Sequence, residues 1–252
     1  PIWCGNTKRR LGRRPRSPAT VSAAAVAPIN CWEDRVLTTV RIFFEKRGEA
    51  AYISLLDLQR VFHRLLKISG LPVWYTQGFN PHIYLSFSCP LSLGQESLCE
   101  SCEVKTEQET IDGAAWQAAL QPLMPRGITI TKVARAEEKV SAIAAAVYEV
   151  TMPLSSAPAL EAYNAAPAAE VTKKTKRGQK ALDLKAYLPR LDWQAEGEQL
   201  HFAVQLPCGS GEALNLNPAL LMQYLQGLGG APAWQCRVLR THLYDQTGRD
   251  FA

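Results

Sequence analysis

The sequence lacks the features that mark most membrane and secreted proteins. No uninterrupted apolar run approaches the ~20 residues that a membrane-spanning helix needs, and no segment joins a charged start to an apolar middle as a secretory signal does. The seven cysteines are odd in number and spread along the chain. They therefore favour reduced thiols over a disulfide framework. Together these absences predict a soluble, cytoplasmic protein.

Recognisable catalytic motifs are also absent. The sequence contains no phosphate-binding glycine loop, nucleophile elbow or HExxH zinc motif. The stretch CESC at residues 99–102 has C-x-x-C spacing, but it begins a predicted strand and no second pair accompanies it. His201 and His242 lie in predicted strands, where a structural role is the simplest interpretation. We therefore expect no metal, no cofactor and no catalytic activity of the chain's own.

Positive charge is scarce outside the N-terminus. The first 36 residues carry seven basic and two acidic side chains, an excess equal to the net charge of +5, so the remainder is neutral on average. Residues 1–35 show no sustained periodicity and predict a disordered basic lead-in. An organelle transit peptide or the end of a larger polypeptide would have a similar composition. Attraction of the remaining chain for nucleic acid must then come from local patches.

The order of predicted elements indicates an α+β fold. Alternating apolar residues predict a strand over 36–44, and Ser54 with Asp57 three residues later predicts a capped helix that runs to Gly70. The remaining elements of this unit are two extended segments, a strand, a helix and a strand at residues 73–76, 83–87, 99–106, 111–123 and 128–134. This is a β-α-β-β-α-β order.

A similar order follows in the second half. Its predicted elements are a strand, a short helix, two extended segments, a strand, a helix capped by Asn217 and a closing strand, at residues 147–152, 157–165, 170–174, 181–187, 200–206, 218–228 and 237–244. The sequence thus predicts two ferredoxin-like halves, over 36–136 and 145–252, with largely antiparallel sheets and helices on one face. Only the element order recurs, not the sequence.

The most informative stretch is YTQGFNPH at residues 75–82, between two extended segments. Gly78 tolerates a positive φ, and Asn80 before Pro81 favours a turn. A hairpin without further role is the simplest interpretation, yet the stretch has more varied chemistry than a tight turn needs. The side chains suited to stack on bases or to contact their edges are Tyr75, Gln77, Phe79, Asn80 and His82.

Two basic clusters accompany this stretch. Arg60, Arg64 and Lys67 recur at steps of four and three, so they lie side by side on the predicted helix. The second cluster surrounds Gly178 and consists of Lys173, Lys174, Lys176, Arg177 and Lys180. Such a run is usually a solvated hairpin tip, and phosphate contact is the competing interpretation.

A series of short motifs extends over nearly all of residues 37–245. Its members are Ser54–Arg60, Leu71-Pro72, residues 75–82, Ser86-Phe87, Pro90-Leu91, Gly94, Glu96-Ser97 and, more weakly, Lys174–Gly178, Asp183–Lys185 and the strand around Arg240. The series resembles the radical-SAM-associated (radical-SAM-linked) bacterial family of uncharacterised domains. In that family the domain stands alone or is fused behind a cobalamin-binding-type radical SAM enzyme. The stand-alone genes often lie near a ribonuclease E/G and large-subunit ribosomal protein genes.

One residue departs from the family pattern. Leu55 stands where a histidine usually follows the capping serine, which favours a non-catalytic role. The sequence also lacks the cysteine triad of a radical SAM enzyme, so that activity is not expected of this chain.

We therefore expect an accessory RNA-binding or substrate-presenting protein, linked to radical SAM RNA modification or to ribosome or tRNA metabolism. Its expected partners are tRNA or rRNA and a radical SAM enzyme, with no membrane. The side chains expected to hold phosphates are Arg60, Arg64, Lys67, Lys174, Lys176 and Arg177, while Ser54, Asp57, Gly78 and Pro81 shape the motif. One alternative is an RNA-modifying enzyme of pseudouridine-synthase-like architecture, which requires a catalytic acid in a central cleft. Another is a protein-interaction module for a radical SAM partner, which requires an exposed apolar surface.

Overall fold

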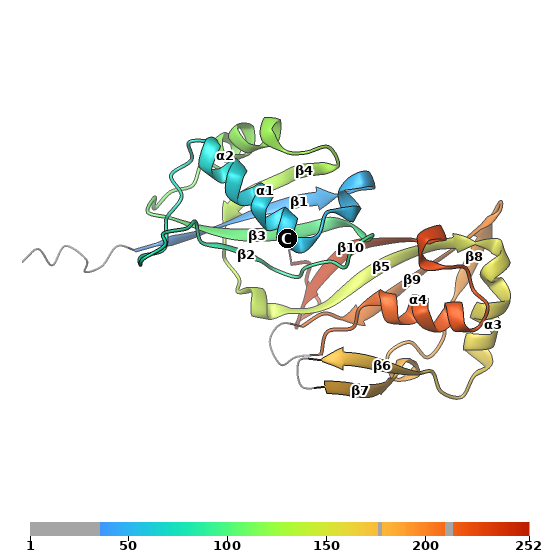
Figure 1. Ribbon diagram of the computed structural model, residues 1–252. Helices are drawn as coiled ribbons and strands as arrows, with labels where there is room; N and C mark the ends of the chain where they lie inside the picture. The colour runs from blue at the N-terminus through green and yellow to red at the C-terminus, as the bar shows by residue number, and fades with distance from the viewer. Residues whose placement is uncertain (1–35, 176–177, 210–213, 252) are drawn as a thin grey trace, which may run out of the picture. The chain divides into compact units, whose positions relative to one another are not determined.

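The computed structural model describes residues 36–175, 178–209 and 214–251 (Figure 1). The predicted lead-in at residues 1–35 lies outside the described residues, and so do Lys176 and Arg177 of the second basic cluster. Val36–Ala252 form one compact unit of mixed strands and helices, which confirms the α+β class. No helix in the described ranges is long and apolar enough to cross a membrane.

One eight-stranded sheet runs through this unit in the order β4-β1-β3-β10-β5-β9-β8, with β2 paired to β3. The strands are β1 (Thr38–Lys46), β2 (Leu85–Phe87), β3 (Glu96–Thr106), β4 (Ile128–Arg135), β5 (Ile143–Pro153), β8 (Trp193–Glu196), β9 (Gln199–Pro207) and β10 (Arg237–Asp245). Only the junction of β3 with β10 is parallel, and it contains two residue pairs. All other neighbours in the sheet are antiparallel.

The two halves of the sheet share one connectivity. In the first half (β1 to β4), α1 (Leu55–Ile68) and α2 (Gly113–Leu120) separate strands that lie in the order β4-β1-β3-β2. In the second half (β5 to β10), α3 (Ala157–Ala165) and α4 (Pro218–Gly227) separate strands in the equivalent order β10-β5-β9-β8. The assignment of two ferredoxin-like halves stays a prediction, with which this repeated order agrees.

The second half contains an extra hairpin that the sequence prediction placed wrongly. β6 (Glu170–Thr175) and β7 (Gly178–Asp183) pair only with each other, apart from the main sheet. The segments predicted at 170–174 and 181–187 are therefore not the inner strands, and residues 184–186 form a short 3-10 turn. The strand that completes the sheet is β8, which was missed because its four residues lie at an edge and are mostly exposed.

Each half buries its own core beneath its helices. In the first half, Val40, Ile42 and Phe44 alternate along β1 and pack against Phe62 of α1 and Trp116 of α2. The rings of Phe44 and Phe62 lie 5.1 Å apart. The remaining short 3-10 turns are Gly48–Tyr52, Gln121–Leu123, Val140–Ala142, Leu154–Ser156 and Ala233–Gln235.

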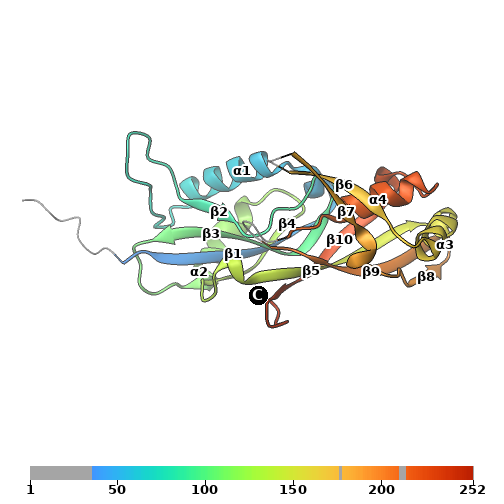
Figure 2. The ribbon, with the colours of Figure 1, turned by 90° about the horizontal axis from the view of Figure 1, so that it is seen from below.

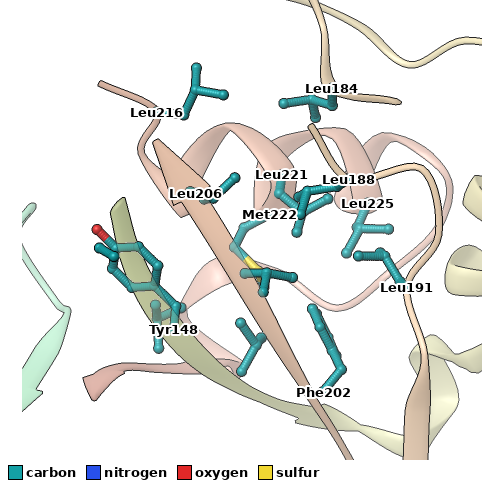
Figure 3. Close-up of a cluster of buried hydrophobic side chains, with 14 of the residues drawn as sticks. Tyr148, Leu184, Leu188, Leu191, Phe202, Leu206, Leu216, Leu221, Met222 and Leu225 are labelled. Carbon is teal, nitrogen blue, oxygen red and sulfur yellow. The ribbon is translucent and has the colours of Figure 1, made fainter. Parts of the chain in front are cut away.

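The second core is larger and more aliphatic (Figure 3). Leu221, Met222 and Leu225 of α4 point toward Phe202 and Leu206 of β9. Leu184, Leu188 and Leu191 of the segment after β7 close the other side of the same cluster. The hairpin β6–β7 is thus anchored by the residues that follow it.

Candidate functional site

Helix α1 begins with the cap that the sequence predicts. The Ser54 hydroxyl accepts the backbone N–H of Asp57 at 3.1 Å and donates to the Asp57 carboxylate at 2.7 Å. That carboxylate also accepts from Arg60 at 2.9 Å. These hydrogen bonds, the one from Ser54 first, lower the pKa of Asp57. The start of α1 is therefore fixed, and Arg60 is tied to it.

The basic residues of α1 lie on its exposed side. Arg60, Arg64 and Lys67 all face solvent, while Phe62 and Leu66 face the core. Within the described part of the chain, Arg64 and Lys67 take part in no ion pair. These two cations are thus available to an external anion, whereas Arg60 would have to release Asp57.

The motif forms a closed hairpin. Its base is the bridge between Tyr75 and Ile83. Above it, the Thr76 N–H donates to the His82 carbonyl at 2.8 Å, and the His82 N–H donates to the Thr76 hydroxyl at 3.2 Å. Nδ1 of His82 lies 3.1 Å from both the Thr76 hydroxyl and the Asn80 carbonyl. His82, which was expected to contact bases, therefore uses Nδ1 to close the loop.

The tip of the hairpin presents its side chains to solvent. Phe79 is fully exposed, at 105% of its reference area, and Tyr75 is 39% exposed. Gln77, Asn80 and Pro81 are exposed as well. Gly78 has a φ of 141°, which a residue with a side chain adopts only with strain. The loop therefore holds an aromatic ring outside the core, where it has no packing role.

The hairpin lies beside α1. Figure 2 shows the connection between α1 and β2, which contains the motif, projecting past the end of the helix. The pKa of His63 in α1 is lowered, mainly by burial and also by the charge of His82. The structure therefore brings the motif and the basic side of α1 into one region of the surface.

Two aromatic residues next to the motif hold a further cation. The Lys105 ammonium lies 4.6 Å from the ring centroid of Tyr84 and 5.8 Å from that of Trp74. The backbone N–H of Trp74 also donates to the Lys105 carbonyl at 2.7 Å. Sequence reasoning missed this trio, because Lys105 on β3 is distant from the motif in sequence. The aromatic residues immediately before and after the hairpin were the available signal.

The second basic cluster is only partly described. Lys173 and Lys180 are direct cross-strand partners in β6–β7, and the Lys173 ammonium donates to the Asn215 carbonyl at 2.5 Å. The side chain of Lys174 lies outside the described residues, as Lys176 and Arg177 do. A groove between this cluster and α1 stays a prediction.

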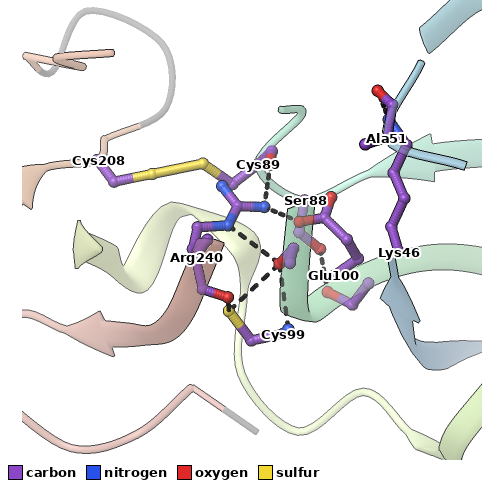
Figure 4. Close-up of polar contacts among 10 residues, drawn as sticks. Lys46, Ala51, Ser88, Cys89, Cys99, Glu100, Cys208 and Arg240 are labelled. Atoms are coloured by element: carbon purple, nitrogen blue, oxygen red, sulfur yellow. Dashed lines mark hydrogen bonds and ion pairs between the residues drawn. A yellow bond between two sulfur atoms is a disulfide. The ribbon is translucent and has the colours of Figure 1, made fainter. Parts of the chain in front are cut away.

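A buried charged cluster joins the two halves where β3 meets β10 (Figure 4). Arg240 forms an ion pair with Glu100, and their side chains are 1% and 4% exposed. Arg240 also donates to the Cys89 carbonyl at 2.6 Å. Burial is the largest single effect and would lower the pKa of Arg240. The attraction of Glu100 together with that of Tyr148 and Cys99 outweighs it, so the pKa is raised. Sequence reasoning missed Glu100, whose only signal was a charge at an inward position of a strand.

Lys46 of β1 completes this cluster. Its ammonium donates to the carbonyls of Ala51 and Ile53 at 3.3 and 3.0 Å. Burial lowers the pKa of Lys46, and Arg240 adds to that effect while Glu100 opposes it. The cluster is satisfied internally and shielded from solvent, which fits a structural role.

The C-x-x-C stretch shows no features of thiolate chemistry. Burial raises the pKa of Cys99 to about 11 and also raises that of Cys102, so both thiols are protonated at neutral pH. No group of three or more potential metal ligands gathers in the described ranges. The structural interpretation of this stretch stays a prediction, with which the raised pKa values of its thiols agree.

Two other cysteines correct the expectation of reduced thiols. Cys89, which follows β2, forms a disulfide with Cys208 at the end of β9. The two residues are 119 positions apart, so only the folded arrangement of the halves brings them together. Cysteine count and spacing do not contain that information.

A family model described as "uncharacterized protein conserved in bacteria (DUF2344)" matches residues 39–218. That range covers most of the chain. The protein belongs to this family. A search of curated proteins finds no match to the sequence.

The matched range places most candidate residues inside the family domain. It contains α1, the motif hairpin and the hairpin β6–β7, from the beginning of β1 to the beginning of α4. Arg240 of the buried cluster lies beyond it, while its partner Glu100 lies within it. The surface around the motif is thus part of the domain that defines this family.

Proposed function

We propose that this protein binds single-stranded RNA as an accessory factor, with the motif hairpin contacting bases and α1 holding phosphates. The observation that carries the proposal is the fully exposed ring of Phe79 at the tip of a closed hairpin. A ring held outside the core by hydrogen bonds is a stacking platform that every base can use.

The closed hairpin supports stacking because it fixes the loop before a ligand arrives. The backbone and hydroxyl bonds between Thr76 and His82 join its two sides. Binding then orders fewer groups, which leaves more of the interaction energy for affinity. Tyr75 at the base adds a second, half-exposed ring.

The cations around the hairpin support phosphate contact. Arg64 and Lys67 are exposed and without ion pairs in the described region, and Lys105 is held between Trp74 and Tyr84 beside the motif. Neutralising phosphates with such side chains releases counterions and makes binding salt-dependent. This region of the surface therefore contains both exposed aromatic rings and cations, the two features that single-strand binding uses.

The resemblance to the radical-SAM-associated family supports a finer proposal. In it, the bound RNA is tRNA or rRNA, and the protein presents it to a radical SAM enzyme that modifies it. The catalytic alternatives have less support. Glu100, the buried acid at the centre of the molecule, is already paired with Arg240 and shielded from solvent.

Binding of a fluorescent, unstructured 12-nucleotide RNA tests the proposal by anisotropy at several salt concentrations. Phe79→Ala should weaken binding at least about fivefold, since stacking contributes about 1–3 kcal/mol per base. Arg64→Ala with Lys67→Ala should weaken binding and lower the slope of log K against log salt by about 1.4, two phosphate contacts at about 0.7 each.

The controls are exposed aromatic and basic residues elsewhere on the described surface. Tyr187→Ala matches Phe79→Ala, and Arg126→Ala with Arg190→Ala matches the cationic pair. The proposal fails if the intact protein shows no saturable RNA binding, or if the control variants weaken it as much as the test variants do.

A further inference from the structure

A cleft on the second half lies outside the surface discussed above. It has a volume of about 620 Å³ and lies where β5, β9 and the beginning of β10 meet the turn Ala233–Gln235. Pockets that hold small ligands usually measure about 300–1,000 Å³, so the cleft has the size for a nucleoside. It shares no residue with the motif hairpin or α1.

The floor of the cleft is a polar row across three strands. Arg237 of β10 pairs with Thr151 of β5, which pairs in turn with His201 of β9. Side chains alternate along a strand. These three therefore lie on the face opposite the core residues Met152 and Phe202.

One ring nitrogen of His201 forms a hydrogen bond, and the other has no hydrogen-bond partner in the described part of the chain. Its Nδ1 lies 3.1 Å from the Thr151 hydroxyl. Its Nε2 is 4.0 Å from the Glu196 carboxylate, which is beyond hydrogen-bond distance. The neutral ring can present Nε2 as a donor or an acceptor, depending on the tautomer that Thr151 stabilises.

Trp234 forms the wall of the cleft and is 77% exposed. The turn that carries it is tied down at both ends. The Gln235 N–H donates to the Pro232 carbonyl at 2.9 Å, and the Cys236 thiol donates to the same carbonyl at 3.4 Å. On the other side, the Ala231 N–H donates to the Ser156 hydroxyl at 3.0 Å. The backbone that carries the indole is therefore held in place, while the exposed ring itself does not pack in the core.

The chemistry of the lining indicates the ligand. An indole face stacks on a planar heteroaromatic ring, and the amides of Gln199 and Gln235 beside His201 offer donors and acceptors to its edge. The cleft does not favour a phosphate. Arg237 is bound to Glu96 at 2.7 Å, and Glu198 also lines the cleft. We propose that this cleft binds a single nucleobase, stacked on Trp234, from a free nucleoside or from an RNA chain.

Saturation-transfer NMR with the full chain tests the proposal, with adenosine and uridine as probes and ribose 5-phosphate as the base-free control. The nucleosides should give saturable signals strongest at the base protons. Trp234→Ala should weaken their binding at least about fivefold. Trp234→Phe, which keeps an aromatic face, should retain most of it, and His201→Ala should weaken it less than Trp234→Ala does.

Tyr187→Ala is the matched control, because it removes an exposed aromatic ring that belongs to neither proposed surface. Nucleoside binding that is unchanged in Tyr187→Ala and lost in Trp234→Ala supports the cleft, whatever the outcome for RNA at the hairpin. Equal binding of ribose 5-phosphate, or nucleoside binding indifferent to Trp234→Ala in a variant that melts like the parent, overturns the proposal. So does the absence of binding to the intact protein.

The source of the base is distinguished by competition. If the cleft takes a base from an RNA chain, a short unstructured RNA should displace adenosine from the Phe79→Ala variant. If it takes a free nucleoside, the RNA should leave adenosine bound.

Discussion

The side chains that join the two halves are charged, and their burial makes each dependent on the other. Arg240 and Glu100 are almost fully inaccessible, and Lys46 lies beside them. An ion pair taken out of water adds little net stability, but removing one partner leaves the other charge buried without compensation. The pair therefore favours this junction over any arrangement that would leave either residue alone.

Glu100→Gln should lower the free energy of unfolding by about 3–5 kcal/mol, because it leaves the Arg240 guanidinium buried and unpaired. Urea denaturation followed by circular dichroism measures the change. Asp192→Asn breaks the exposed pair with Arg190 and should produce no resolvable change. A Glu100→Gln protein as stable as the parent would contradict this account of the junction.

The helices and strands of this fold differ in how well the sequence predicts them. The cap of α1 was predicted from Ser54 and Asp57, because a cap is a local pattern of four residues. The short edge strand β8 and the separate hairpin β6–β7 were not, because pairing partners depend on contacts that sequence periodicity does not record. For the same reason, the motif was found as a stretch, whereas Lys105 and the cleft at Trp234 were missed.

One glycine before β4 is required by a close approach between elements. Gly127 has a φ of 85°, and its carbonyl accepts the Arg47 N–H at 2.8 Å. A Cβ on this residue would lie 2.3 Å from the Arg47 carbonyl oxygen and 2.9 Å from the Ala50 Cβ. The end of β1 and the beginning of β4 can therefore meet only around a residue without a side chain.

Gly127→Ala should destabilise the protein by more than the ~1–2 kcal/mol of left-handed backbone strain alone, because a steric clash is added to it. Gly197→Ala is the matched control, since Gly197 has a φ of 59° with open space around it. Thermal unfolding of both variants compares the two. Equal losses would show that the approach to Arg47 imposes no constraint.

At the scale of the whole molecule, a covalent link joins the two halves in addition to the sheet. The disulfide between Cys89 and Cys208 closes a loop across 119 positions of sequence. In the chain-entropy account, a loop of that length restricts the unfolded chain by about 4–5 kcal/mol. The bond therefore acts on the unfolded chain and not only on the packing of the folded one.

Cys208→Ser should lower the free energy of unfolding by about 2–5 kcal/mol under non-reducing conditions, the upper end being the chain-entropy value. Added dithiothreitol should bring the parent down to the level of the variant, and denaturant titrations with and without reductant measure both. Cys236→Ser, which removes a thiol outside the bond, should keep the dependence on reductant. A parent protein that unfolds identically in both conditions would refute the link.

The parallel contact of β3 with β10 has a consequence for the order in which the protein is made. The strands β1, β2, β3 and β4 are complete at Arg135, whereas β10 begins only at Arg237. During synthesis, Glu96 and Ser97, the two residues of β3 that will pair with β10, therefore lack this partner for about a hundred further residues, while β2 already pairs with residues 102–104 of the same edge. A nascent chain stalled in that interval leaves this short part of the edge open to pairing with a neighbouring chain, and β10 covers it last.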